Sequence, residues 1–106
     1  MELEYLFSYG TLQNSVVQKE VFRKIIVGLK DYLVNYKLDN ITLEDKEYPI
    51  IVFSNSNKDK VEGTLFELSK TELLGADIYE TSAYKRIKVT LLSKKECWVY
   101  VNANQK

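Results

Sequence analysis

The chain has 106 residues, 45% of them hydrophobic, which predicts one packed domain over residues 1–106. Fifteen basic and fifteen acidic residues cancel, so we expect neither a nucleic-acid partner nor an anionic membrane surface. No apolar run approaches the ~20 residues that span a bilayer. The first five residues (MELEY) are acidic, and a lone cysteine, Cys97, has no partner for an internal disulfide. We therefore expect a cytoplasmic protein.

Residues 4–10 (EYLFSYG) are rich in aromatic side chains and predict a buried strand, which ends at a YGTL break. After this break, Ser15 and Gln18 have the spacing of a capping box at the start of a helix. Apolar residues then recur at helical spacing at positions 17, 21, 22, 25 and 26. Gly28 is expected to end this helix in a left-handed cap.

Residues 31–43 (DYLVNYKLDNITL) predict one strand, or two strands with a turn at Asp39-Asn40. The polar segment LEDKEYP is expected to be a loop that leads into a strand, PIIVFS. The next segment, SNSNKDK, has the composition of a turn. The run VEGTLFEL predicts a strand, and its Gly63 indicates either close packing or a nearby ligand that leaves no room for a side chain.

Ser69 and Glu72 predict a second capping box, followed by a short helix through Leu73, Leu74 and Ile78. The final runs, YKRIKVTLL and ECWVYV, predict a hairpin that turns at residues 93–95. The chain thus has five to seven strands and two helices. We expect a small α+β domain whose sheet curls toward a barrel.

The sequence contains no histidine, which removes Ser-His and Cys-His nucleophile pairs together with the usual zinc and iron sites. Cys97 lies in an alternating, strand-like run, so we interpret it as a packing residue. Proton transfer in an enzyme of this composition must fall to a carboxylate, a tyrosine or a lysine. No metal or cofactor is expected.

Two stretches have the residues for chemistry. In the first, the strand that turns through Gly10 into a helix directs backbone N–H groups to one point, as in sites that bind a carboxylate, a phosphate or an oxyanion. The alternative is that Gly10 merely allows the turn. In the second, Glu80 lies between an apolar helix end and an apolar strand, where burial would raise its pKa toward the range of a general base. The alternative is a surface glutamate that pairs with Lys85 or Arg86.

Together these stretches resemble the γ-glutamylcyclotransferase-like proteins, including the small AIG2-like members. The resemblance covers nearly the whole chain and rests on the order and spacing of several blocks: LFSYGTL, YPIIV, VEGTLFEL, ADIYE, YKRIKV and WVYV. It implies a small mixed β-barrel flanked by two helices, which agrees with the elements predicted above.

The resemblance also implies roles for particular residues. Backbone groups of Tyr9, Gly10, Thr11 and Leu12 would hold the α-carboxylate and amine end of the substrate. Glu80 would be the acid/base residue of a D-x-x-E pattern that begins at Asp77. Tyr84 is a further candidate for substrate contact and the next candidate base. These roles imply that a small γ-glutamyl amine or dipeptide is converted to 5-oxoproline and a free amine, without a metal.

One position departs from the family pattern. Members often have a glycine directly after the glutamate, whereas this chain has Thr81. If the position needs a positive φ, a β-branched threonine would be strained there and Glu80 would be placed differently. The alternative function is therefore a non-enzymatic member in which the pocket binds a small molecule or a protein.

Overall fold

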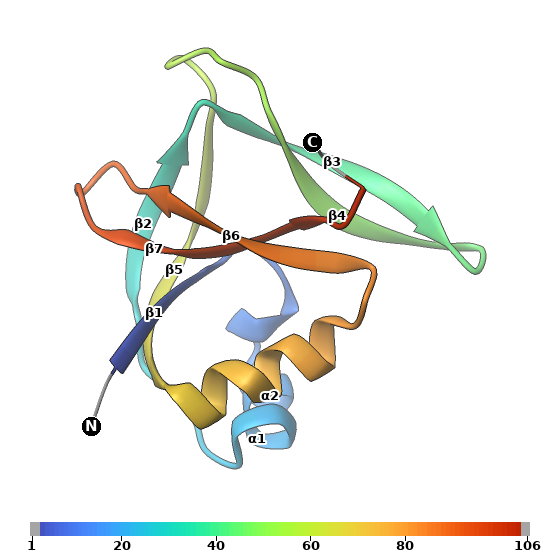
Figure 1. Cartoon of the computed structure of the whole chain (residues 1–106), viewed down its shortest axis with the longest axis vertical. Helices are drawn as coiled ribbons and strands as arrows, with labels where there is room; N and C mark the ends of the chain where they lie inside the picture. The colour runs from blue at the N-terminus through green and yellow to red at the C-terminus, as the bar shows by residue number, and fades with distance from the viewer. Residues whose placement is uncertain (1–2, 105–106) are drawn as a thin grey trace.

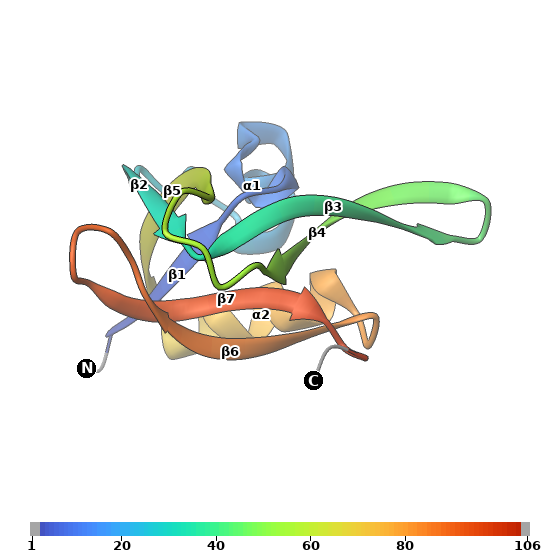
Figure 2. The same ribbon diagram turned by 90° about the horizontal axis from the view of Figure 1, so that it is seen from above.

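A computed structural model describes residues 3–104 as a five-stranded mixed sheet, a separate two-stranded hairpin and two helices (Figure 1). The main sheet has the order β2-β5-β1-β7-β6, in which β1 and β7 are parallel and the other neighbours are antiparallel. Strands β3 and β4 pair only with each other and extend away from the main sheet (Figure 2). The elements are β1 (Leu3–Ser8), the 3-10 helix η1 (Thr11–Gln13), α1 (Ser15–Phe22), β2 (Leu29–Val34), β3 (Tyr36–Leu43), β4 (Lys46–Phe53), β5 (Lys60–Ser69), α2 (Lys70–Glu80), β6 (Tyr84–Thr90) and β7 (Glu96–Asn102).

Strand β1 separates two hydrophobic cores, because successive side chains of a strand point to opposite faces of the sheet. Leu6 packs with side chains of both helices, including Phe22 and Leu73. Phe7, the next residue, packs on the other face with Leu33 and with Ile51 of the hairpin strand β4. The end of β1 therefore lies where the helices, the sheet and the hairpin meet.

The predicted α+β fold is confirmed, but the sheet does not close into a complete barrel. Strands β2 and β6 are its two edges. The turn between β6 and β7 bridges the gap to β2: the Leu92 N–H donates to the Tyr32 carbonyl (2.8 Å), and the Ser93 hydroxyl donates to Asp31 (2.5 Å). Cys97 is fully buried in the core between these edges, and burial raises the pKa of its thiol to about 12, which agrees with a packing role.

The first helix begins and ends differently from the prediction. Its cap is Asn14, whose side chain accepts a hydrogen bond from the Val16 N–H (2.8 Å), so the capping box at Ser15 is wrong. The helix ends at Phe22, because Arg23 takes a left-handed conformation. Gln18 is buried and instead binds the Leu12 carbonyl and the Ile26 N–H, both at 2.9 Å. Its side chain thus fixes the chain on both sides of the helix.

Two glycines allow close contact between elements rather than left-handed turns. Gly28 has no positive φ, so the predicted helix cap there is wrong. A Cβ on Gly28 would lie 2.5 Å from Thr64 Cγ2 and 2.6 Å from the Leu65 carbonyl of β5. A Cβ on Gly63 would overlap the Ser8 carbonyl of β1. Of the two explanations for Gly63, the structure supports close packing.

The segment after β2 forms a hairpin rather than strand and loop. Residues 31–43 do form two strands, but the break is at Asn35, which has a φ of 70°, and the Asp39-Asn40 pair lies inside β3. The predicted loop LEDKEYP is wrong: Glu44 and Asp45, with φ of 50° and 65°, make a tight turn directly between β3 and β4. Pro49 lies within β4, where a two-stranded hairpin leaves an unpaired edge that accommodates it.

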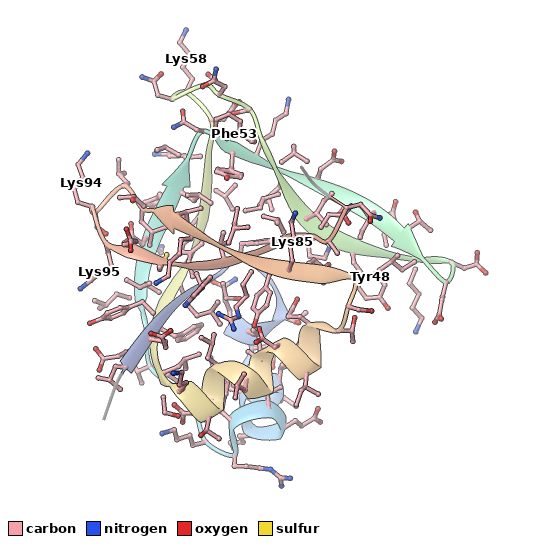
Figure 3. All side chains as sticks on the ribbon, viewed as in Figure 1. Tyr48, Phe53, Lys58, Lys85, Lys94 and Lys95 are labelled. Carbon is pink, nitrogen blue, oxygen red and sulfur yellow. The ribbon has the colours of Figure 1, made fainter. Side chains whose placement is uncertain are left out.

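The remaining predicted elements are confirmed. The SNSNKDK segment connects β4 and β5 without regular structure. Ser69 caps α2 in a full capping box with Glu72, and the last hairpin turns at residues 93–95. In Figure 3, Lys58 and Lys94 mark the tips of these two connections and point away from the molecule. No helix within residues 3–104 is long and apolar enough to span a membrane.

Candidate active site

A cavity of about 700 Å³ lies where the turn after β1, the junction of α2 and β6, and the β3–β4 hairpin meet. These three segments are distant in the sequence and come together because β1 runs through the centre of the sheet. The residues that line the cavity are Phe7, Ser8, Tyr9, Gly10, Thr11, Leu43, Glu44, Tyr48, Pro49, Tyr79, Glu80, Thr81, Ser82, Ala83, Tyr84 and Tyr100.

The turn after β1 contributes Tyr9, Gly10 and Thr11 to this cavity, whereas the side chain of Leu12 is buried in the core beneath it. The Tyr9 hydroxyl donates to the main-chain carbonyl of Tyr100 (2.7 Å). Burial, together with nearby Tyr84 and Glu80, raises the pKa of Tyr9. Tyr9 is therefore a fixed, neutral wall of the cavity.

Gly10 has a φ of −124° and a ψ of −146°, so it does not serve a left-handed turn. A Cβ at this position would meet only Pro49 Cγ, at 3.9 Å, on the other wall of the cavity. The Gly10 carbonyl accepts hydrogen bonds from the main chain and the side chain of Gln13, both at 3.2 Å. Because carbonyl and N–H point to opposite sides of a trans peptide, this holds the Thr11 N–H away from Gln13.

Glu80 is the last residue of α2, and its carboxyl group has no hydrogen bond or ion pair with any residue in the described part of the chain. Burial raises the pKa of its carboxyl from 4.5 to about 7. The alternative of a surface pair with Arg86 is wrong, because Arg86 binds Asp77 instead. Glu80 therefore has the pKa of a group that exchanges a proton near neutral pH.

Asp77, one helical turn before Glu80, has the opposite environment. It accepts hydrogen bonds from Arg86 and from the Tyr100 hydroxyl (2.7 Å). Burial by itself raises the pKa of Asp77, but these donors outweigh burial and hold it below its usual value. The leading aspartate of the D-x-x-E pattern is thus a charged anchor between α2, β6 and β7.

Thr81 follows Glu80 with a φ of 65° and a ψ of −177°. This region is occupied almost only by glycine, and other residues there cost roughly 1–3 kcal/mol. Thr81 therefore has the positive φ at which, as argued from the sequence, a β-branched residue is strained. The Thr81 hydroxyl accepts a weak hydrogen bond from the Ala83 N–H (3.3 Å) as the chain turns into β6.

Sequence reasoning missed the contribution of the hairpin. Leu43, Glu44, Tyr48 and Pro49 line the cavity, but they fall in the segment that was predicted to be a loop. Tyr84 joins the hairpin to the site, since its hydroxyl donates to the Pro49 carbonyl (2.9 Å). Tyr79 was missed as well; its hydroxyl lies 2.6 Å from the Thr11 hydroxyl. The sequence signal that could have identified Tyr79 is its position directly before Glu80.

The charged residues in the lining are Glu44 and Glu80, and both are acidic. Within residues 3–104, no lysine or arginine lines this cavity. A bound carboxylate would therefore depend on neutral hydrogen-bond donors, whereas a bound amine would find carboxylates on two sides.

Residues 6–106 match the family described as gamma-glutamyl cyclotransferase, AIG2-like. The chain belongs to this family. The resemblance inferred from the sequence blocks is thereby confirmed, as is the family fold. The comparison with curated proteins found no match.

Solved structures of similar proteins have the same fold. A protein of Arabidopsis thaliana superposes with a TM-score of 0.80 at 24% identity, over 100% of this chain and 66% of its own. A protein described as gamma-glutamyl cyclotransferase gives a TM-score of 0.74 at 21% identity, over 99% and 69% of the two chains. An AIG2-like protein of Mus musculus gives 0.69 at 18%, over 100% and 81%. This family member thus spans about two thirds of the length of the Arabidopsis protein.

Proposed function

We propose that this protein is a γ-glutamyl cyclotransferase, which converts a small γ-glutamyl amine or dipeptide to 5-oxoproline and a free amine. The observation that carries the proposal is the environment of Glu80. Its carboxyl group has no hydrogen-bond partner within residues 3–104, has a pKa of about 7, and lines a cavity with Tyr9, Gly10 and Thr11. Family membership supports the same reaction.

The reaction needs one group that accepts and then returns a proton. In the proposed mechanism, the Glu80 carboxylate removes a proton from the α-ammonium of the substrate, and the freed amine attacks the γ-carbonyl carbon. The tetrahedral intermediate collapses as protonated Glu80 gives the proton to the leaving nitrogen, and the bond between that nitrogen and the γ-carbon breaks. The ring nitrogen loses its second proton, which the released amine takes up, so that 5-oxoproline leaves with one N–H and Glu80 is again a carboxylate. Since amine and carbonyl belong to one molecule, the cavity mainly has to hold a folded conformer.

The charges of the lining favour an amine over an amino acid as the leaving group. Glu44 lies on the hairpin wall of the cavity. With the glutamyl end held by the turn after β1 and by Glu80, the proposed pose places the group beyond the γ-carbonyl against this wall. The leaving group of a dipeptide carries its own carboxylate, which Glu44 would repel in a cavity without a basic lining residue. A neutral or cationic amine has no such conflict. We therefore place γ-glutamyl amines ahead of dipeptides.

A second candidate function is a binding module without catalysis, and the conformation of Thr81 favours it. A threonine held at a φ of 65° directly after Glu80 is a strained connection. Such strain leaves the cavity in place but makes the position of the Glu80 carboxyl group, which catalysis requires to be accurate, less well fixed. The module would then bind a γ-glutamyl compound or another small zwitterion without turning it over.

A panel assay separates the two functions. The purified protein is incubated with γ-glutamyl alkylamides, γ-glutamyl diamines and γ-glutamyl dipeptides, and 5-oxoproline is quantified at pH 6 to 9. We expect turnover to be highest for the amines and to be lost in a Glu80→Gln control. Binding of panel members without any 5-oxoproline would assign the protein to the second function.

A further inference from the structure

A pair of hydroxyl groups joins two walls of the cavity. Thr11 Oγ1 lies 2.6 Å from the Tyr79 hydroxyl oxygen, across 68 positions of sequence. Thr11 begins the 3-10 helix after β1, and Tyr79 lies in the last turn of α2, directly before Glu80. Both residues line the cavity. The bond therefore links the turn to the helix end that carries the proposed base.

The pair of hydroxyl groups retains one O–H that can donate a hydrogen bond to a ligand. Whichever hydroxyl donates within the pair, the other retains its own O–H. Three other tyrosines of the cavity have committed theirs: Tyr9 donates to the Tyr100 carbonyl, Tyr84 to the Pro49 carbonyl, and Tyr100 to Asp77. The pair of Thr11 and Tyr79 is thus a neutral donor on the side of the cavity where α2 ends.

A γ-glutamyl substrate requires such a donor close to Glu80. Its α-amine and its α-carboxylate are attached to the same carbon atom, so a carboxylate must come near whichever residue takes the proton from the amine. A negative group next to the Glu80 carboxylate is unfavourable unless hydrogen-bond donors stabilise it. No basic residue of the described chain lines the cavity. A hydroxyl on the residue next to Glu80 meets this requirement.

We propose that the hydroxyl pair of Thr11 and Tyr79 binds the α-carboxylate of the substrate, which makes Tyr79 a substrate-binding residue. The inference rests on the proposed function for the class of ligand. It assigns to the pair the choice of γ-glutamyl compounds over otherwise identical amides that lack the α-carboxylate. Tyr48, on the hairpin wall, would instead face the group beyond the γ-carbonyl.

The test compares two ligands in several variants. One ligand is N-ethyl γ-glutamine; the other, N-ethyl-4-aminobutanamide, has hydrogen in place of the α-carboxylate. Dissociation constants are measured by NMR titration for wild type, Tyr79→Phe, Thr11→Val, the double variant and Tyr48→Phe. Tyr5→Phe removes a hydroxyl that does not line the cavity and is the matched control, since Tyr5 lies under Lys95.

We expect Tyr79→Phe and Thr11→Val each to weaken binding of the carboxylated ligand by about 10- to 100-fold, as for loss of a hydrogen bond to a charged group. The double variant should lose little more than either single variant, because the two hydroxyls act as a unit. Binding of the ligand without the carboxylate should stay within about twofold in every variant, because the pair does not contact it. Tyr5→Phe should match wild type for both ligands.

Three results would overturn the inference: equal weakening of both ligands, which would show that the pair only fixes the turn; no weakening of either; or selective loss of the carboxylated ligand in Tyr48→Phe instead. Turnover is recorded separately as release of 5-oxoproline or 2-pyrrolidinone. A wild type that binds without turnover would refute the proposed function and leave the binding comparison intact. A wild type that binds neither ligand would refute both.

Discussion

Arg86 donates two hydrogen bonds to Asp77, from Nε at 2.6 Å and from a terminal nitrogen at 2.8 Å. This pair fixes the last turn of α2 to β6, and Arg86 also stacks on the Trp98 ring, 4.4 Å from its centroid. Glu80 lies three positions after Asp77 and has no comparable donor in the described chain. Two carboxyl groups at one helix end therefore have pKa values displaced in opposite directions, a pattern typical of acid/base sites.

Removal of the Arg86 side chain should show how much the stability of the fold depends on the pair of Arg86 and Asp77. Arg86→Met leaves Asp77 with Tyr100 as its main donor, and we expect the free energy of unfolding at pH 7 to fall by about 1–3 kcal/mol, the lower part of that range if solvent screens the pair. In the double variant with Asp77→Asn, the loss should be smaller than the sum of the two single losses. Urea unfolding of the four proteins measures this; strict additivity would show that the pair has no coupling.

Glu80→Gln keeps the shape of the side chain but cannot accept a proton. If Glu80 is the only base, kcat should fall by about 10²–10⁴-fold, while ligand binding changes much less, because the amide still accepts a hydrogen bond from the substrate ammonium. In the wild type, kcat/KM should decline below about pH 7, where the carboxyl group becomes protonated. Steady-state rates of 5-oxoproline release across pH test both points. Full activity of the variant would move the base elsewhere, with Tyr84 as the next residue to replace.

The raised pKa of Glu80 also has a consequence for stability. Between the ordinary value of 4.5 and about 7, the folded protein binds more protons at this group than the unfolded chain does. The free energy of unfolding should therefore decrease as the pH rises through this window, by on the order of 1–3 kcal/mol relative to Glu80→Gln. Urea unfolding of both proteins at pH 4.5, 6 and 8 measures the difference. Parallel curves would show that Glu80 is not desolvated.

Thr81→Gly should stabilise the protein. Relief of the positive φ is worth roughly 1–3 kcal/mol, and the greater freedom of glycine in the unfolded chain offsets about 0.5–1 kcal/mol of that gain. Thr81→Ala keeps a Cβ in the strained region and is the control. The free energy of unfolding of Thr81→Gly should be greater than that of Thr81→Ala by about 1 kcal/mol. Thermal unfolding tests this order. If Thr81→Gly also releases 5-oxoproline faster than the wild type, strain at Thr81 displaces Glu80 in the wild type.

Gly10→Val should fold normally and lose ligand binding. The φ of −124° is outside the left-handed region, and a valine side chain would extend toward Pro49 through open space of the cavity. The expected loss of binding therefore rests on steric conflict with the ligand and not on a change of backbone conformation. Gly63→Ala is the contrasting variant, because its Cβ would overlap the Ser8 carbonyl and should destabilise the domain. Ligand titration and thermal unfolding of both variants separate a site glycine from a packing glycine.

The sequence was most informative where one local pattern decides the structure. The capping box at Ser69 and the strand with Gly63 follow from short-range chemistry, and both are observed. It was least informative where a distant contact decides. The first helix stops at Phe22, where Arg23 takes a left-handed conformation and the Gln18 side chain binds the chain on either side of the helix. Gly28 is small because β5 passes directly over it.

The candidate site divides in the same way. Tyr9, Gly10, Thr11 and Glu80 were found because their motifs are contiguous and match a family pattern. The hairpin residues were not found, because residues 43–49 were predicted to be a polar loop. Nothing in the sequence of that segment indicates that it folds back over the end of β1. The partner of Thr11 was missed for a similar reason: only the folded chain places Tyr79 beside it.

As strands, β3 and β4 pair only with each other, and buried Ile50 and Ile51 in β4, together with the hydrogen bond from the Tyr84 hydroxyl to the Pro49 carbonyl, anchor the hairpin to the body. Substitutions, insertions or deletions toward the Glu44-Asp45 tip therefore leave every hydrogen bond of the five-stranded sheet unchanged. Under the proposed function, this separates the part that performs the chemistry from the part that meets the leaving group. An exchange of hairpins between relatives should accordingly transfer preference for a leaving group while the recipient keeps its own base, and natural divergence can follow the same route.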